Sequence, residues 1–278
     1  ISTEINRKIV EKLNDKISKI DDVKIKFKSG KEHRFVIRLR GDGLSGDVTD
    51  TDPHMAGEKL LESKSTSDRE KAKRTAEIVN RITGKVQEVL KDMDVPPNCI
   101  ILRGISGYPD IPQFPEIYKL KALSIATYPM YRGLTELIGM NVEQGVSTIE
   151  EEVEALKNRY SEYDYFYVHF KKIDSYGEDG NFSEKVAKIE EVDRYLPEIM
   201  ELNPDALAIT GDHSTPATYR AHSWHPVPLL ICSKWTRISD VKGFNEGECG
   251  RGNIGRIAAL YLTSLLLAHS ERLDKFGA

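Results

Sequence analysis

The sequence predicts an α/β protein in two parts: a small α+β unit, and a mostly parallel sheet flanked by helices. Residues 1–98 show helix, hairpin and helix patterns in turn, whereas residues 99–278 alternate short apolar runs with helical stretches. Short apolar strands that alternate with helices are typical of a parallel sheet covered on both faces. A chain of 278 residues is also long enough to form two hydrophobic cores.

The first unit opens with an amphipathic helix pattern. Over residues 1–20, isoleucine and leucine recur every three to four positions, which predicts a helix capped by Ser2 or Thr3. Residues 22–41 then alternate apolar and polar side chains on both sides of a Ser-Gly turn. This alternation predicts a β-hairpin.

A polar loop and a long helix complete the first unit. Ser67 and Glu70 have the spacing of a capping box, so we expect a helix to begin there. The prolines of "DVPPN", residues 94–98, predict the end of this helix because proline has no amide donor.

The second part is predicted to alternate strands and helices. Short apolar runs bounded by turn residues indicate the strands, and longer runs with helical periodicity indicate the helices. The expected strands are residues 99–104, 120–127, 163–171, 205–211 and 227–233. The expected helices are residues 131–140, 149–161, 181–202 and 256–273.

Composition excludes several classes of function. The net charge is −4 with both signs mixed along the chain, so neither a nucleic-acid surface nor a polybasic membrane anchor is expected. No apolar run is long enough to span a membrane, and no signal-peptide pattern is present. Three cysteines without CxxC spacing argue against a disulfide framework and favour a reducing, cytoplasmic compartment.

Ligand-type side chains cluster where predicted strands end. Three segments carry them: "KKIDSYGEDGN", "TGDHSTP" and "RAHSWHP". In a parallel α/β sheet such segments meet at one edge, where ligands bind. Carboxylates and imidazoles together suit Mn²⁺ or Zn²⁺, and two neighbouring ions can clamp a phosphoryl group. The candidates are Asp174, Glu178, Asp212, His213, His222 and His225.

Structural roles compete with each of these assignments. An aspartate after a strand is usually a turn residue or a helix cap, the loop histidines can be ordinary loop residues, and Glu178 can be solvated. His169 lies inside a predicted strand and is expected to be a core or wall residue. The coincidence of three segments at one predicted edge is what favours a metal site.

Several of these motifs also carry a family resemblance. "TGDHSTP", "AHSWHPVPLLI", "DSYGEDGNF", "ILRGISGYPDIPQF" and "GRGNIGRI" occur in the order found in the archaeal-type 2,3-bisphosphoglycerate-independent phosphoglycerate mutases of the alkaline phosphatase superfamily. The resemblance implies an alkaline-phosphatase-like sheet at residues 99–278 and an inserted substrate domain at residues 1–98. It implies an isomerase of glycolysis that interconverts 3-phosphoglycerate and 2-phosphoglycerate through a phosphoserine intermediate.

The resemblance also implies two divalent ions, Mn or Zn, with Mg or Co as alternatives. Asp174 and His222 correspond to ligands of one ion, and Asp212 and His213 to ligands of the other. Glu178 stands where the family more often has a histidine, which adds negative charge and puts the metal preference in doubt.

Arginines are the candidates for holding substrate. A guanidinium fork matches both phosphate and carboxylate groups. Phe35, Ile37 and Leu39 are expected on one face of the hairpin, which leaves the basic side chains on the other; the alternative is a solvated basic strand. Asp50, Asp52 and His54 can line the same cleft, although turn formation is the expected role of the two aspartates. The substrate-binding candidates are Arg34, Arg38, Arg40 and Arg103.

No serine in the chain has a context that resembles the family's nucleophile, and the strand bearing one aspartate ligand is not found either. We therefore expect both in a separate or cleaved N-terminal segment, and this chain alone to be inactive. Two rivals stay open: a metal-dependent phosphomonoester hydrolase or phosphotransferase of the same superfamily, and a non-catalytic binding protein derived from it.

Overall fold

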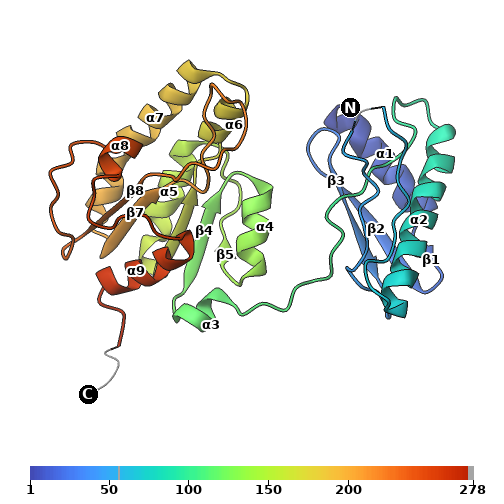
Figure 1. Ribbon diagram of the computed structural model, residues 1–278, viewed down its shortest axis with the longest axis horizontal. Coiled ribbons are helices and arrows are strands. Elements are labelled where there is room, and N and C mark those ends of the chain that lie inside the picture. The colour runs from blue at the N-terminus through green and yellow to red at the C-terminus, as the bar shows by residue number, and fades with distance from the viewer. Residues whose placement is uncertain (56, 275–278) are drawn as a thin grey trace. The chain divides into compact units, whose positions relative to one another are not determined.

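The computed structural model describes residues 1–55 and 57–274 and divides into two compact units, Ile1–Asp110 (unit 1) and Ile111–Ala278 (unit 2). The predicted α/β class is confirmed (Figure 1). Among the described residues no helix has the length and apolar character needed to cross a membrane.

Unit 1 packs two helices against a three-stranded antiparallel sheet of order β1-β2-β3. In β2 the apolar side chains Val23, Ile25 and Phe27 are buried, while the lysines between them are exposed. This alternation supplies one apolar face for the helices, as the hairpin pattern predicts. The elements are α1 (Thr3–Lys16), β1 (Lys19–Ile20), β2 (Val23–Ser29), β3 (Phe35–Arg40) and α2 (Glu70–Lys91).

The caps of the two helices differ from each other. Ser2 caps α1, where its side chain accepts a hydrogen bond from the Ile5 amide at 3.3 Å. The capping box expected for α2 is wrong, because the helix begins at Glu70 after Arg69, which makes no side-chain cap bond. The Ser67 hydroxyl instead reaches the Asp47 carboxylate at 3.5 Å, so the side chain expected to cap the helix faces the preceding loop.

The strand expected at residues 99–104 is also wrong. This segment forms no strand, and its hydrogen bonds go to the loop at residues 50–52 without forming a ladder. The Thr51 amide donates to the Leu102 carbonyl at 3.0 Å, and the Leu102 amide donates to the Thr51 hydroxyl at 2.9 Å. The apolar side chains of Ile100 and Leu102 are buried in the core of unit 1.

Unit 2 contains the predicted parallel sheet, in the order β5-β4-β6. All residues of β4 are buried, as expected for a central strand covered on both faces. The strands β7 and β8 differ from the prediction, because they pair with each other in antiparallel fashion as a separate two-stranded sheet. The strands are β4 (Ala122–Ala126), β5 (Asn141–Val142), β6 (Tyr165–His169), β7 (Ala206–Thr210) and β8 (Leu229–Ser233).

The helices of unit 2 include three that the patterns predict well and several short ones that they do not. The expected helix at residues 256–273 is shorter, since a 3₁₀ turn at Ala259–Tyr261 precedes α9. Residues 172–178, where no helix was expected, form α6. The helices are α3 (Phe114–Tyr118), α4 (Pro129–Leu137), α5 (Ile149–Arg159), α6 (Lys172–Glu178), α7 (Phe182–Glu201), α8 (Glu246–Cys249) and α9 (Leu262–His269), with a further 3₁₀ turn at Tyr160–Glu162.

Candidate metal centre

Two carboxylates of the candidate site come from one short helix. β6 ends at His169, and α6 begins three residues later. Asp174 and Glu178 are four residues apart on α6, and side chains at that spacing lie on the same face of a helix. The helix therefore presents both carboxylates in one direction.

A closed loop supplies the imidazoles. Asp212 and His213 follow the end of β7, and the chain returns through an isolated bridge in which the Ser223 amide donates to the Ser214 carbonyl at 2.8 Å. This bridge brings His222 beside His213, so that the ring centroids are 3.7 Å apart with the planes inclined at 30°. Two histidines nine positions apart in the sequence thus become neighbours.

Asp174 joins these imidazoles. Its Oδ1 lies 3.8 Å from His213 Nδ1 and 3.6 Å from His222 Nε2. The ligand atoms of the three residues all lie within 4.8 Å of one another. His222 Nε2 is also 3.6 Å from Glu178 Oε1. Three of the predicted ligands therefore converge on one small volume, and Glu178 adjoins it through His222.

The fifth predicted ligand, Asp212, lies on the other side of His213. Its Oδ2 is 3.3 Å from His213 Nε2, so His213 stands between Asp174 and Asp212. His225 points to other partners: its Nδ1 is 3.0 Å from the Ser223 hydroxyl, and its ring stacks on Trp224. The structure does not bring His225 into the group formed by Asp174, His213 and His222.

The close approach of α6 to the histidine loop depends on Gly177. A Cβ at this position would lie 2.4 Å from the Thr215 carbonyl oxygen, well inside van der Waals contact. Glycine is therefore required where the helix touches the loop. This contact sets the distance between the carboxylates of α6 and the imidazoles.

Asp174 is held in its charged form by two neighbours. The Thr215 hydroxyl donates to Asp174 Oδ1 at 2.6 Å, and Lys171 Nζ donates to Oδ2. Burial raises the pKa of the Asp174 carboxyl, but these hydrogen bonds outweigh burial and the net pKa lies below the usual value. The Thr215 hydroxyl also lies 2.9 Å from His213 Nδ1 and so connects two predicted ligands.

Asp212 has its own supporting pair. The Tyr131 hydroxyl donates to Asp212 Oδ2, and His169 Nε2 lies 3.7 Å from the same oxygen. Burial raises the pKa of Asp212, and the hydrogen bond from Tyr131 together with the neighbouring histidines lowers it below its usual value. Burial and the Asp212 carboxylate raise the pKa of Tyr131, so this phenol stays a donor. His169, expected as a wall residue, has its ring 3.9 Å from that of Tyr131.

The donor set fits a divalent cation. Imidazole suits Zn²⁺ and several first-row transition ions, and carboxylate suits Mn²⁺ and Mg²⁺. Two imidazoles and a carboxylate within 4.8 Å satisfy the proximity that a shared ion requires. Hydrogen bonds from Thr215 and Tyr131 supply the outer partners that orient ligating carboxylates.

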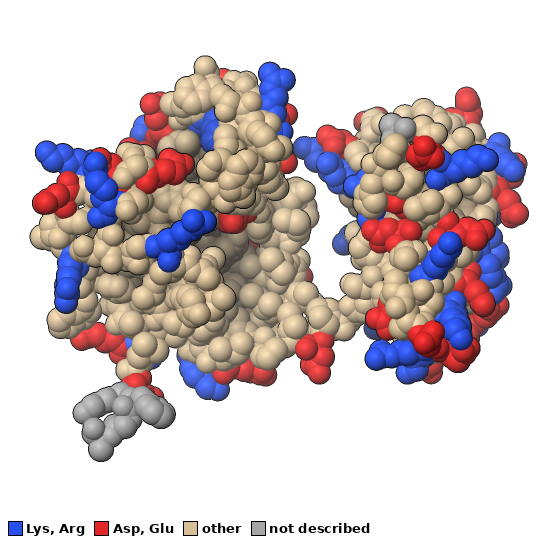
Figure 2. Space-filling view, in the orientation of Figure 1, with Lys and Arg blue, Asp and Glu red and all other residues tan. Residues whose placement is uncertain are grey.

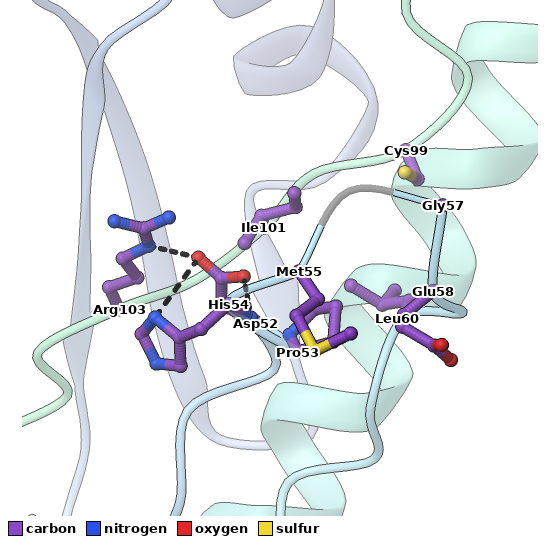
Figure 3. A pocket seen from close by; sticks show the side chains of 10 residues that line it. All are labelled: Asp52, Pro53, His54, Met55, Gly57, Glu58, Leu60, Cys99, Ile101 and Arg103. Carbon is purple, nitrogen blue, oxygen red and sulfur yellow. Dashed lines mark hydrogen bonds and ion pairs between the residues drawn. The ribbon is translucent and has the colours of Figure 1, made fainter.

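Unit 1 places one predicted arginine at a cavity. Arg103, Asp52 and His54 line a cavity of about 360 Å³, and Arg103 Nε donates to the Asp52 carboxylate (Figure 3). Arg34 pairs with Glu32 at 2.8 Å instead. Arg38 and Arg40 are exposed and point away from the buried face of β3, as the alternation predicts.

The sequence patterns did not identify the three residues that donate hydrogen bonds to the candidate carboxylate ligands: Lys171, Thr215 and Tyr131. Lys171 follows the end of β6 and Thr215 lies within "TGDHSTP", so both were close to recognised motifs. Tyr131 lies on α4, far away in the sequence, and has no local signal. Lys171 contacts Asp174 from only three residues away, whereas Thr215 and Tyr131 reach their carboxylates through the tertiary packing of unit 2.

Comparisons with known proteins agree on a family. A family model described as "2,3-bisphosphoglycerate-independent phosphoglycerate mutase" matches residues 1–96, and a "Metalloenzyme superfamily" model matches residues 84–269. A probable 2,3-bisphosphoglycerate-independent phosphoglycerate mutase of Thermotoga maritima is 53% identical over 277 residues, which cover 100% of this chain and 68% of the relative. A protein of Thermus thermophilus with the same description is 47% identical over 279 residues, covering 99% of this chain and 68% of the relative.

Solved structures show the same fold. A protein from Pyrococcus horikoshii superposes with a TM-score of 0.80 at 24% identity, covering 100% of this chain and 72% of that one. A cofactor-independent phosphoglycerate mutase from Thermoplasma acidophilum superposes with a TM-score of 0.68 at 24% identity, covering 94% and 69% of the two chains.

Proposed function

The chain belongs to the 2,3-bisphosphoglycerate-independent phosphoglycerate mutase family, and we propose that it forms part of an enzyme that interconverts 3-phosphoglycerate and 2-phosphoglycerate. The observation that carries this proposal is the grouping of Asp174, His213 and His222 within 4.8 Å, at the position where the chain matches the metalloenzyme model. We assign the reaction to glycolysis and gluconeogenesis in the cytoplasm. Residues 1–98 would serve as the substrate domain and residues 99–278 as the metal-binding part.

The ligands divide between two divalent ions in this proposal. Asp174, Glu178 and His222 would hold one ion, and Asp212 and His213 the other. Mn or Zn is the expected metal, with Mg or Co as alternatives. When bound, such ions neutralise the charge on a transferring phosphoryl group and activate a serine hydroxyl.

Side chains around the ligands keep them ready for this role. Lys171 and Thr215 hold the Asp174 carboxylate ionised and fixed, while Tyr131 does the same for Asp212. Fixed ligands reduce the reorganisation needed when charge develops during transfer. The arginine candidates would orient the phosphate and carboxylate of the substrate.

The serine nucleophile and one further aspartate ligand would come from a segment outside residues 1–278. The chain covers 68% of the length of its curated relatives, which leaves room for such a segment. Large apolar side chains in unit 2 are also exposed, such as Trp224 at 78% and Ile238 at 98%. Figure 2 shows a broad area without charged side chains on the visible face of this unit. A surface of that kind favours a further packing partner.

The test is product analysis with 3-phosphoglycerate. We expect the 278-residue chain with Mn²⁺ to bind metal but to turn over little substrate. A fusion of this chain to the N-terminal segment of a relative, called the completed protein below, should form 2-phosphoglycerate. Formation of 2-phosphoglycerate by the chain alone contradicts the external nucleophile. Release of inorganic phosphate in place of 2-phosphoglycerate by the completed protein would establish the hydrolase instead.

Variants of the completed protein distinguish the substrate-binding residues from the metal ligands. Arg34→Ala or Arg103→Ala should raise KM for 3-phosphoglycerate while the metal content stays unchanged. Equal KM values in these variants and the parent would remove the two arginines from the substrate site.

A further inference from the structure

The start of helix α4 contacts the groups around both candidate carboxylates of unit 2. Its first turn carries Tyr131, whose hydroxyl donates to Asp212 Oδ2. The ammonium group of Lys171 lies over the ring of Tyr128, the residue directly before α4, at 5.2 Å from the ring centroid. Lys171 in turn donates to Asp174 Oδ2. The start of α4 therefore reaches Asp212 directly and Asp174 through Lys171.

The helix itself does little to fix this turn. Within the described part of the chain, the N-cap residue Tyr128 makes no side-chain cap bond, and Pro129 at the first helical position has no amide to donate. The Arg132 amide donates to the Tyr128 carbonyl at 3.3 Å, which is long for such a bond. The position of the turn therefore depends on contacts from outside the helix.

Glu152 on α5 supplies such a contact. Its Oε1 accepts a hydrogen bond from the amide of Thr127, the residue between β4 and Tyr128, at 3.0 Å. β4 is paired on both sides, with β5 and with β6, so the sheet already fixes the chain up to the end of that strand. The bond from Glu152 extends the fixed backbone by one residue, as far as the N-cap of α4.

Glu152 is not used by its own helix. The capping box of α5 is formed by Thr148 and Glu151, whereas Glu152 is the next residue and is only 1% exposed. Burying a carboxyl group costs free energy unless it is hydrogen-bonded. Burial raises the pKa of Glu152 to about 8, so at neutral pH it accepts from Thr127 mainly as an uncharged acid. The amide of Thr127 is thus the polar group that this buried side chain serves.

We propose that Glu152 is a positioning residue of the metal centre, which acts by fixing the first turn of α4. Through that turn it sets the position of Tyr131, and with it the hydrogen bond to Asp212. The same turn places the Tyr128 ring beneath Lys171. The inference rests on the proposed function in treating the carboxylates at the ends of these two contacts as metal ligands.

Three variants separate positioning from a general contribution to stability. Glu152→Leu removes the acceptor for the Thr127 amide but keeps an apolar side chain in the core. Glu152→Gln keeps a carbonyl oxygen in place of the uncharged acid and should restore the contact. Leu156→Ala is the matched control, because it opens a cavity in the same apolar core, one turn further along α5, and leaves Glu152 in place.

The first measurement is the Mn²⁺ affinity of the 278-residue chain, by competition with a chelator. Glu152→Leu should weaken Mn²⁺ binding about tenfold, the lower end of the effect of losing an outer partner of a metal ligand. Glu152→Gln and Leu156→Ala should bind Mn²⁺ as the parent does. Parent-like affinity in Glu152→Leu, or an equal loss in Leu156→Ala, would overturn the positioning role.

The second measurement needs no metal. It follows the Tyr131 ring carbon that carries the hydroxyl, by NMR of the chain with ¹³C-labelled tyrosine, and the signal missing from Tyr131→Phe identifies it. Glu152→Leu should shift this signal, whereas Glu152→Gln should leave it in place; an unmoved signal in Glu152→Leu would overturn the proposal. If Glu152→Leu fails to fold, Glu152→Asp replaces it, because the shorter side chain withdraws the acceptor from the amide, and the same outcomes decide.

The two measurements separate this inference from the proposed function. A shifted Tyr131 signal in Glu152→Leu, with no Mn²⁺ bound by the parent and no mutase turnover by the completed protein, would refute the proposed function and leave the positioning of Tyr131 standing. Mutase turnover by the completed protein, with an unmoved signal and parent-like Mn²⁺ affinity in Glu152→Leu, would refute the positioning role alone.

Discussion

Glu152 gives the structure a pH dependence that can be calculated and tested. Three glutamates stand in a row at the start of α5, and Glu152 is the one that faces inward, with 1% of its surface exposed. It accepts a hydrogen bond from the Thr127 amide at 3.0 Å, at the turn between β4 and α4. Burial raises the pKa of Glu152 from 4.5 to about 8, and the bond from Thr127 opposes this only in part.

The sign of the effect follows from proton linkage. The native state holds a proton on Glu152 that the unfolded state has lost above pH 4.5. The free energy of unfolding therefore falls as pH rises from 4.5 through about 8, by about 1.4 kcal/mol per pH unit. Glu152→Gln removes this dependence and keeps a carbonyl for the Thr127 amide. We expect the stability advantage of the variant to grow by about 3 kcal/mol between about pH 5.5 and about pH 8.

Urea unfolding followed by tryptophan emission measures this difference, because Trp224 and Trp235 are the two tryptophans of the chain and both lie in unit 2. Glu154→Gln, on the exposed side of the same helix, is the control and should differ from the parent by the same amount at both pH values. A constant difference between Glu152→Gln and the parent would refute the argument from burial.

Three further predictions concern the candidate metal centre. Asp212→Ala or His222→Ala should lower the metal content and the activity of the completed protein by orders of magnitude. Atomic emission measures the metal content, and full activity with stoichiometric metal would mean that the site is misplaced. Tyr131→Phe should weaken metal affinity about 10- to 100-fold in a chelator competition while the circular dichroism spectrum stays unchanged, because it removes an outer hydrogen bond to Asp212. Gly177→Ala should destabilise the fold by about 1–3 kcal/mol and weaken metal binding, because its Cβ would meet the Thr215 carbonyl; an unfolding midpoint equal to that of the parent would exclude this contact.

Local periodicity accounts for the parts of the fold that could be predicted. The hairpin of β2 and β3, the helix α1 and the strand β4 each have a pattern that depends only on neighbouring residues. The predictions that failed concern features that depend on contacts between distant residues. Residues 99–104 have an apolar run typical of a strand, but a strand needs a partner, and the bonds of Leu102 go to Thr51. The patterns of β7 and β8 indicated strands without showing that they would pair with each other.

The candidate ligands could be predicted because their chemistry is concentrated at the ends of strands. The residues that orient them could not, because contact requires tertiary packing. Tyr131 reaches Asp212 from 81 positions away, and Thr215 reaches Asp174 from 41. In the same way, the three adjacent glutamates of α5 look alike in sequence, and only the packing of the helix selects Glu152 for burial.

Local contacts fix the geometry of each polar cluster within its own unit. In unit 2, carboxylates and imidazoles face one another, with Lys171 already paired to Asp174. In unit 1, the buried Asp52 carboxylate contacts the exposed side chains of Arg103 and His54. Each set depends on contacts inside its own unit, so neither needs the other for its geometry.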